Sequence, residues 1–229
     1  MEETGTFSAL VDEVMARSLR KERVADIVSY ARTTVRECSV LENFQENLIE
    51  DQLIADANPF LWEKPLNLRS IVAFEYPTML DVDGRPIKPK VSSPAERLHR
   101  DELYYYYLSG SSFVLANIDI GMLVNVAYLS YLPRLVYYQN VADRPARFDT
   151  STETWTYHTD YSGNDALNLS GRQKVTNWLI HRWFDLIVEG TLAKLYKTIN
   201  DDRASSSYAL YKQQQQDLKS AERHVQLGG

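Results

Sequence analysis

The side chains best suited to acid–base or metal chemistry are sparse in this 229-residue sequence. The single cysteine, Cys38, excludes an intrachain disulfide and a cysteine-built zinc site. It falls on an apolar helical pattern, where a cysteine is more often a small buried residue than a nucleophile. The histidines lie too far apart to show metal-ligand spacing: His99, His158, His181 and His224. We therefore predict no metal ion and no cofactor.

Paired carboxylates are the other groups with catalytic potential, because two of them can share the acid–base work on a glycosidic bond. The pairs in this chain are Glu42/Glu46, Asp81/Asp83 and Asp201/Asp202. Residues 81–84 lack the twelve-residue pattern and terminal glutamate of a calcium loop, so we interpret them as a polar turn. Motifs for nucleotide binding, serine hydrolysis and zinc proteolysis do not occur in the sequence. The sequence thus predicts a protein that is not an enzyme.

A run of four tyrosines, Tyr104 to Tyr107, is the most distinctive local feature. Alternate side chains of a strand face opposite sides, so two of these rings would enter a core and two would face outward. Half-buried sheet packing accounts for most of the aromatic residues, and a protein–protein interface is the favoured further role. A platform for stacking bases would need interleaved Arg and Lys, and residues 109–131 contain neither. The predicted interface residues of this region are Tyr105, Tyr107, Tyr128 and Tyr131.

The sequence divides into three blocks, and the pattern of the first predicts helices. Apolar spacing predicts one helix around residues 10–19, an amphipathic helix over 24–38 and a further helix over 44–53. The last of these is expected to end before Asn58-Pro59, because the residue before a proline avoids the helical region.

The middle block changes character, with dense β-branched and aromatic residues and all eight prolines lying between Pro59 and Pro145. The predicted strands are Leu68–Phe74, Tyr104–Leu108, Phe113–Ala116, Met122–Tyr131, Arg134–Tyr138 and Thr154–His158. Short strands separated by tight turns, such as the one at 83–86, predict an antiparallel sandwich or meander.

The third block begins with a wide apolar stripe over 178–199, which predicts one helix capped by Asn177 or Thr176. Gly190 costs this helix about 1 kcal/mol relative to alanine, and such a glycine is often kept where two backbones approach closely. A second helix is predicted over 204–224. It is rich in Gln and Lys and has little to bury, so we predict assembly contacts along it and its tail: Tyr208, Tyr211, Gln215, Leu218, His224 and Leu227.

The order of helices, strands and helices predicts an α+β fold. In this prediction residues 1–59 and 162–229 form a helical bundle with a C-terminal tail, and residues 60–161 form an inserted antiparallel β-sandwich-like domain.

Composition narrows the functional classes. The chain has 25 Lys and Arg against 31 Asp and Glu, a net charge of −6, whereas a duplex-binding surface needs an excess of basic residues. An acidic wall past which DNA moves without being held is compatible with this charge. The apolar runs are far shorter than the roughly 20 residues that cross a bilayer, and the acidic N-terminus does not read as a signal peptide. We expect synthesis and assembly in the cytoplasm, with no membrane anchor.

Several of these segments together resemble the head-to-tail adaptor proteins of short-tailed bacteriophages, the tail tubular protein A family. The resemblance rests on the order of helices and strands and on packing motifs. These motifs are Trp178 to Trp183, Asp185-Leu186, Glu189 to Ala193, Asp201 to Ala204 and the Tyr208-x-x-Tyr211 helix, with Tyr104 to Leu115 and Val126 to Tyr138 upstream. One departure is Trp183-Phe184, which stands where the family pattern leads us to expect a tyrosine and a proline.

This resemblance implies a structural virion protein that forms a ring, a dodecamer in the family, between the portal protein and the tail nozzle protein. It implies that the C-terminal segment reaches toward the portal, that the β domain meets tail components such as nozzle and fibres, and that DNA passes through the channel without specific binding.

Two other functions remain open on the sequence alone. The first is a tail-associated β-domain module that recognises a host receptor or carbohydrate, because aromatic side chains at Trp155, Tyr157 and Tyr161 could stack on sugars. The second is a cell-wall hydrolase that uses the carboxylate pairs named above.

Overall fold

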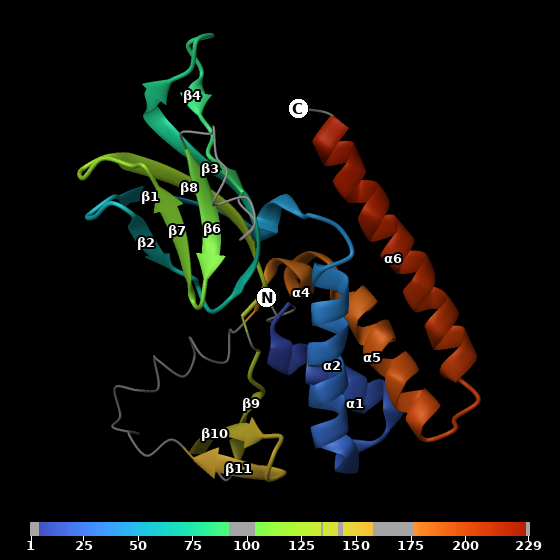
Figure 1. Ribbon diagram of the computed structural model, residues 1–229. Helices are drawn as coiled ribbons and strands as arrows, with labels where there is room; N and C mark the ends of the chain where they lie inside the picture. The colour runs from blue at the N-terminus through green and yellow to red at the C-terminus, as the bar shows by residue number, and fades with distance from the viewer. Residues whose placement is uncertain (1–4, 92–103, 134, 142–143, 158–175, 228–229) are drawn as a thin grey trace. The chain divides into compact units, whose positions relative to one another are not determined.

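The computed structural model describes residues 5–91, 104–133, 135–141, 144–157 and 176–227 (Figure 1). The chain divides into two compact units. We call the first, Met1–Phe44 with Leu132–Gly229, the helical unit, and the second, Gln45–Tyr131, the β unit. The predicted α+β class is confirmed.

The helical unit contains five described α-helices and a three-stranded antiparallel sheet of order β11-β10-β9. The helices are α1 (Phe7–Ser18), α2 (Val24–Ser39), α4 (Trp178–Arg182), α5 (Phe184–Thr198) and α6 (Ala204–Leu227). The strands are β9 (Tyr138–Val141), β10 (Arg144–Asp149) and β11 (Thr154–Tyr157). A short 3-10 turn, Lys21–Arg23, connects the first two helices.

The first two helices follow the sequence pattern closely. Helix α1 begins where the Thr6 hydroxyl accepts a hydrogen bond from the amide of Ala9 at 3.1 Å, which satisfies one of the free amides of the first turn. Helix α2 buries Ile27, Val28 and Ala31 on one face, together with Cys38. The predicted helices around 10–19 and over 24–38 are both confirmed.

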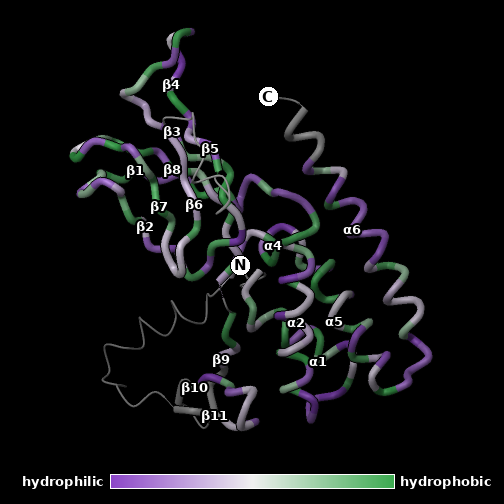
Figure 2. Tube along the Cα trace, viewed as in Figure 1, coloured by the Kyte–Doolittle hydropathy of each residue, from purple (hydrophilic) through white to green (hydrophobic). Residues whose placement is uncertain are grey.

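The predicted single helix over 178–199 is interrupted at Trp183, whose φ of −129° and ψ of 41° are not helical. Its start is capped as predicted, because Asn177 Oδ1 accepts a hydrogen bond from the Ile180 amide at 3.0 Å. Beyond the break, α5 is buried along most of its length. Helix α6 is mostly hydrophilic (Figure 2) and packs along α5, which confirms the predicted final helix.

The β unit is formed by two four-stranded sheets, of order β1-β8-β3-β4 and β2-β7-β6-β5. The first sheet contains β1 (Leu48–Ile54), β3 (Leu68–Leu80), β4 (Pro86–Ile87) and β8 (Leu123–Ser130). The second contains β2 (Phe60–Glu63), β5 (Lys90–Val91), β6 (Tyr105–Ser109) and β7 (Ser112–Ala116). Their side chains share one core, centred on Phe74, Tyr76 and Leu115. All described pairs are antiparallel except β5–β6, which is parallel.

The predicted helix over 44–53 is wrong, because Leu48–Ile54 is strand β1. Phe44 packs on Trp178 in the helical unit, with ring centroids 4.9 Å apart, whereas Ile49 and Leu53 pack on the core of the β unit. The apolar residues that appeared to form one helical face therefore belong to the cores of two different units.

The boundaries between the units also differ from those predicted from the sequence. The units separate at 44/45 and 131/132, whereas the sequence placed the separations at 59/60 and 161/162. Strands β9 to β11 accordingly belong to the helical unit, where Tyr137 and Phe148 join the helix core. The predicted strand over 134–138 is not formed at 135–137; Tyr138 instead begins β9.

Candidate assembly interface

The four consecutive tyrosines alternate between the two sides of the second sheet. The Tyr106 ring lies 4.7 Å from that of Phe74, and the Tyr104 ring lies 5.7 Å from that of Tyr76, so both pack on the core. Tyr105 and Tyr107 face the other way. Their rings stack on each other with centroids 6.2 Å apart and an interplanar angle of 21°.

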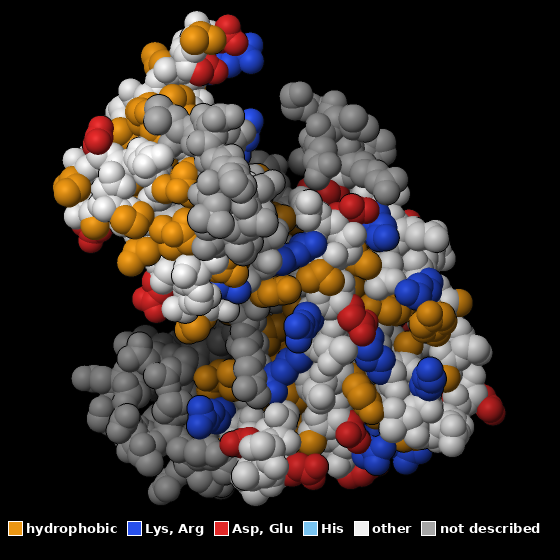
Figure 3. Space-filling view, viewed as in Figure 1, with side chains coloured by type: hydrophobic (Ala, Val, Ile, Leu, Met, Phe, Trp, Pro, Cys, Tyr) orange, Lys and Arg blue, Asp and Glu red, His pale blue; other side chains and the backbone are white. Residues whose placement is uncertain are grey.

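Strand pairing places small and apolar residues around these two rings. Tyr107 lies opposite Val114, which in turn lies opposite Leu61, and Tyr105 lies opposite Ala116. Leu61 is 60% exposed, whereas the two tyrosines are half-buried and Val114 and Ala116 are buried. We call these five residues the outer tyrosine face. Figure 3 shows hydrophobic side chains gathered over the strands of this unit.

Charged residues border the outer tyrosine face at its edges. Lys90 pairs with Tyr105 on the β5 edge, and Glu63 pairs with Ser112 near the β2 edge. Aromatic residues at the centre and charged residues at the rim are typical of a protein–protein interface. Alternation along the tyrosine run was sufficient to predict that Tyr105 and Tyr107 lie on the side away from the core; their role in an interface stays a prediction. Leu61 was missed because β2 was not predicted.

The other two predicted tyrosines of this unit are placed differently. Tyr128 is only 7% exposed and packs on Trp62, with ring centroids 5.7 Å apart, so its side chain belongs to the core. Tyr131 is 37% exposed and follows the end of β8, where its amide donates to the Asn67 carbonyl at 2.7 Å.

The predicted contact residues of α6 fall on two sides of that helix. Tyr211, Gln215 and Leu218 are buried within the helical unit, whereas Tyr208 is 55% exposed. The backbone of residues 224 and 227 belongs to α6, but the predicted side chains of His224 and Leu227 lie outside the described part of the structure.

A polar network holds Tyr211 between α2, α5 and α6. Its hydroxyl donates to Glu37 Oε2 at 3.2 Å and lies 3.7 Å from Cys38 Sγ. Lys194 Nζ donates to the same Glu37 oxygen at 2.7 Å and to Thr34 Oγ1 at 3.2 Å. Burial, together with the neighbouring Cys38 and Glu37, raises the pKa of Tyr211, so the hydroxyl stays protonated as a donor.

Two of the groups with catalytic potential in the sequence, Cys38 and Asp81, have structural surroundings. Cys38 is fully buried, and burial raises the pKa of its thiol, which disfavours the nucleophilic thiolate. No group of three metal-binding side chains occurs in the described ranges. Asp81 closes a turn, because its carboxylate accepts hydrogen bonds from the amides of Asp83 and Arg85, both at 2.9 Å.

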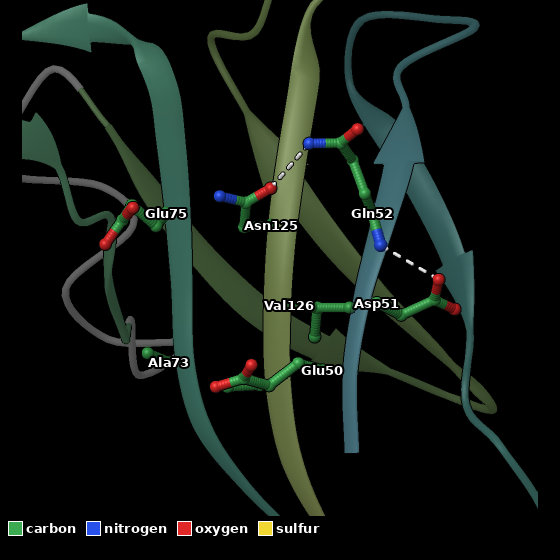
Figure 4. A pocket seen from close by; sticks show the side chains of 8 residues that line it. Glu50, Asp51, Gln52, Ala73, Glu75, Asn125 and Val126 are labelled. Carbon is green, nitrogen blue, oxygen red and sulfur yellow. Dashed lines mark hydrogen bonds between the residues drawn. The ribbon is translucent and has the colours of Figure 1, made fainter.

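A shallow hollow of about 480 Å³ lies on the first sheet of the β unit (Figure 4). Its lining includes Ala73, Glu50 and Glu75. At one end the Gln52 side-chain amide donates to Asn125 Oδ1 at 2.9 Å. The hollow is lined by acidic and amide side chains, which suit the binding of cationic or polar groups.

No protein-family model matches the chain, and no curated protein matches its sequence. In the described part of the chain, every helix is too short or too polar to cross a lipid bilayer.

Proposed function

We propose that this chain is a structural protein that functions in many copies, as a head-to-tail adaptor ring between the portal and the tail nozzle of a short-tailed bacteriophage. The observation that carries the proposal is the outer tyrosine face, where two stacked, half-buried tyrosines and the exposed Leu61 lie on the side of the sheet away from its core. Half-buried aromatic rings beside the exposed Leu61 favour further burial against another protein.

The rest of the chain is compatible with a scaffold that performs no turnover. The helical unit has a continuous core running from α1 to α6, and Glu37, Lys194 and Tyr211 bond to one another within it. The net charge of −6 is consistent with a channel wall along which DNA moves without being held. The order of helices, strands and helices from which the resemblance was drawn is present in the described residues.

The carbohydrate-binding alternative receives less support from the arrangement of its aromatic residues. Trp155 and Tyr157 belong to β11 of the helical unit, apart from the β unit in which a binding module was expected, and Tyr161 lies outside the described residues.

The proposal is tested by measuring the mass of the purified chain alone and after mixing with the portal protein encoded in the same genome. A ring-shaped adaptor predicts a complex with many copies of the chain per portal. The head-to-tail contacts between copies must close into a ring, so we expect one complex of defined mass and not a series of complexes with increasing copy number. A chain that stays monomeric at every ratio of portal would overturn the proposal.

A further inference from the structure

Strand β1 is the outermost strand of the first sheet, and its outer side has no partner strand among the described residues. Its backbone groups alternate between the two sides, as they do in any antiparallel pair. The Ala55 amide donates to the carbonyl of Met122, just before β8, at 2.9 Å, so this set of groups faces β8. The Gln52 amide belongs to the other set, and it donates to the neighbouring side chain, Asp51 Oδ1, at 2.8 Å. The backbone groups of every second residue of β1, Gln52 among them, therefore face an open edge.

An open edge of this length is a ready template for another strand. Strand β1 is seven residues long and pairs with β8 in unbroken register from Leu48 to Ile54. Prolines and bulges, which commonly block such an edge, do not occur within β1. Main-chain hydrogen bonds to an added strand supply affinity, and the side chains beside the edge decide which strand is accepted.

The side chains beside this edge are acidic and border the hollow on the outer face of the first sheet. Glu50 on β1 and Glu75 on β3 both line the hollow (Figure 4). Across the sheet, Glu50 lies opposite Ala127, which in turn lies opposite Ala73. Glu75 already attracts an ammonium group, because Lys88 Nζ lies 3.8 Å from its Oε2. The two alanines leave room for the aliphatic part of a lysine or arginine whose charged end lies at the carboxylates.

The distribution of charge favours a different protein as the source of the added strand. Strand β1 carries two acidic residues, Glu50 and Asp51, and no basic one, so pairing with β1 of a second copy brings like charges together. By sequence, the β unit has 12 acidic and 7 basic residues, and the helical unit has 19 acidic and 18 basic residues. Neither unit has an excess of positive charge, so charge complementarity selects a basic segment of another protein.

We propose that the open edge of β1 binds an extended, basic segment of another protein by strand addition. Every second side chain of the added strand lies on the same face of the sheet as Glu50, and an arginine or lysine at these positions reaches the hollow. The inference goes beyond the proposed ring, because it concerns a single copy of the chain and a different partner. It therefore holds or fails independently of ring formation.

A fluorescently labelled peptide of alternating arginine and threonine, as long as β1, tests the proposal on the purified chain. Fluorescence anisotropy at physiological ionic strength should show saturable binding. Glu50→Gln/Glu75→Gln should weaken it about tenfold, through the loss of two opposite-charge contacts. The matched control, Asp83→Asn/Asp119→Asn, removes the same charge from exposed turns of the β unit and should have little effect, because charges away from the hollow are screened. Absence of saturable binding would overturn the proposal, as would equal weakening by the two double variants.

Strand addition predicts a second result that charge attraction alone does not. Successive residues of a strand point their N–H groups to opposite edges, so only one alternate set of the peptide amides can bond to β1. Two further peptides carry methyl groups on the amide nitrogens of either the arginines or the threonines. One of the two should lose binding while the other binds as well as the unmodified peptide. Two methylated peptides that bind equally would overturn strand addition and leave the ring, which the mass measurement with portal tests, unaffected.

Discussion

The ring of Tyr211 on α6 occupies the space that a side chain at Gly190 on α5 would need. A Cβ atom at this glycine would lie 2.6 Å from Tyr211 Cε2 and 2.5 Å from Thr34 Cγ2. Both distances are shorter than real Cβ contacts allow. The absence of a side chain at Gly190 therefore allows α2, α5 and α6 to pack this closely. The expected stabilities of several variants follow from this contact.

Gly190→Ala is expected to destabilise the chain although alanine favours helices. Overpacking costs about 1–3 kcal/mol, and the gain in helix propensity offsets roughly 1 kcal/mol of it. Chemical denaturation measures the change in unfolding free energy. Adding Thr34→Ser should restore part of the loss, since it removes the clashing methyl group and keeps the hydroxyl that Lys194 contacts. A Gly190→Ala chain more stable than wild type would contradict the close packing.

Tyr211→Phe should cost about 1 kcal/mol of stability, because the ring stays in place while the hydrogen bond to Glu37 is lost. Tyr211→Ala removes the buried ring as well and should cost about 3–5 kcal/mol. The matched control is Tyr208→Phe on the exposed side of the same helix, with almost no effect expected. Equal effects of the two Tyr→Phe changes would show that the network around Tyr211 is not a stabilising contact.

The two sides of the tyrosine run should separate stability from assembly. Tyr106→Thr removes a core ring that packs on Phe74 and should cost about 3 kcal/mol of stability. The double variant Tyr105→Thr/Tyr107→Thr keeps residues that favour strands and should lose less than about 1 kcal/mol at each position. We expect its unfolding temperature to fall by only a few degrees, while its binding in the assembly assay is lost. Full assembly by this folded double variant would show that the outer tyrosine face is not an assembly interface.

Asp201 gives a pH-dependent prediction at the turn before α6. The hydrogen bonds donated by the Arg203 side chain and amide lower the pKa of its carboxyl to about 2. Because the pKa is lowered in the folded state, the carboxylate stabilises the fold at pH values above the ordinary carboxyl pKa. This stabilisation is lost as the pH falls through about 2. Asp201→Asn should therefore be less stable than wild type at neutral pH, and the two should converge between about pH 4 and pH 2. A difference that does not change with pH would exclude this contribution.

Sequence reasoning succeeded where one local pattern belongs to one core. The spacing of Ile27, Ala31 and Cys38 describes a face that packs entirely within the helical unit. The tyrosine run was predicted equally well, because the alternation of a strand is a local property. The polar network of Glu37, Lys194 and Tyr211 could not be found in this way, since it joins α2 to residues 157 and 174 positions further along the chain.

The missed elements have specific physical reasons. Strand β1 carries Ile49 and Leu53 four residues apart, a spacing that fits a helix, and only the pairing of β1 with β8 makes it a strand. The break at Trp183 lies within a continuous apolar stripe, so periodicity alone indicates an uninterrupted helix. Strands β4 and β5 are two residues each, too short for any alternation to be visible.

The central claim is that this chain forms a closed ring on a portal, and electron microscopy of the chain mixed with its portal tests that claim most directly. A closed ring predicts added density coaxial with the portal, with repeated subunits around an open channel. Images that show portals unchanged, with the chain present only as single particles at every ratio, would contradict it.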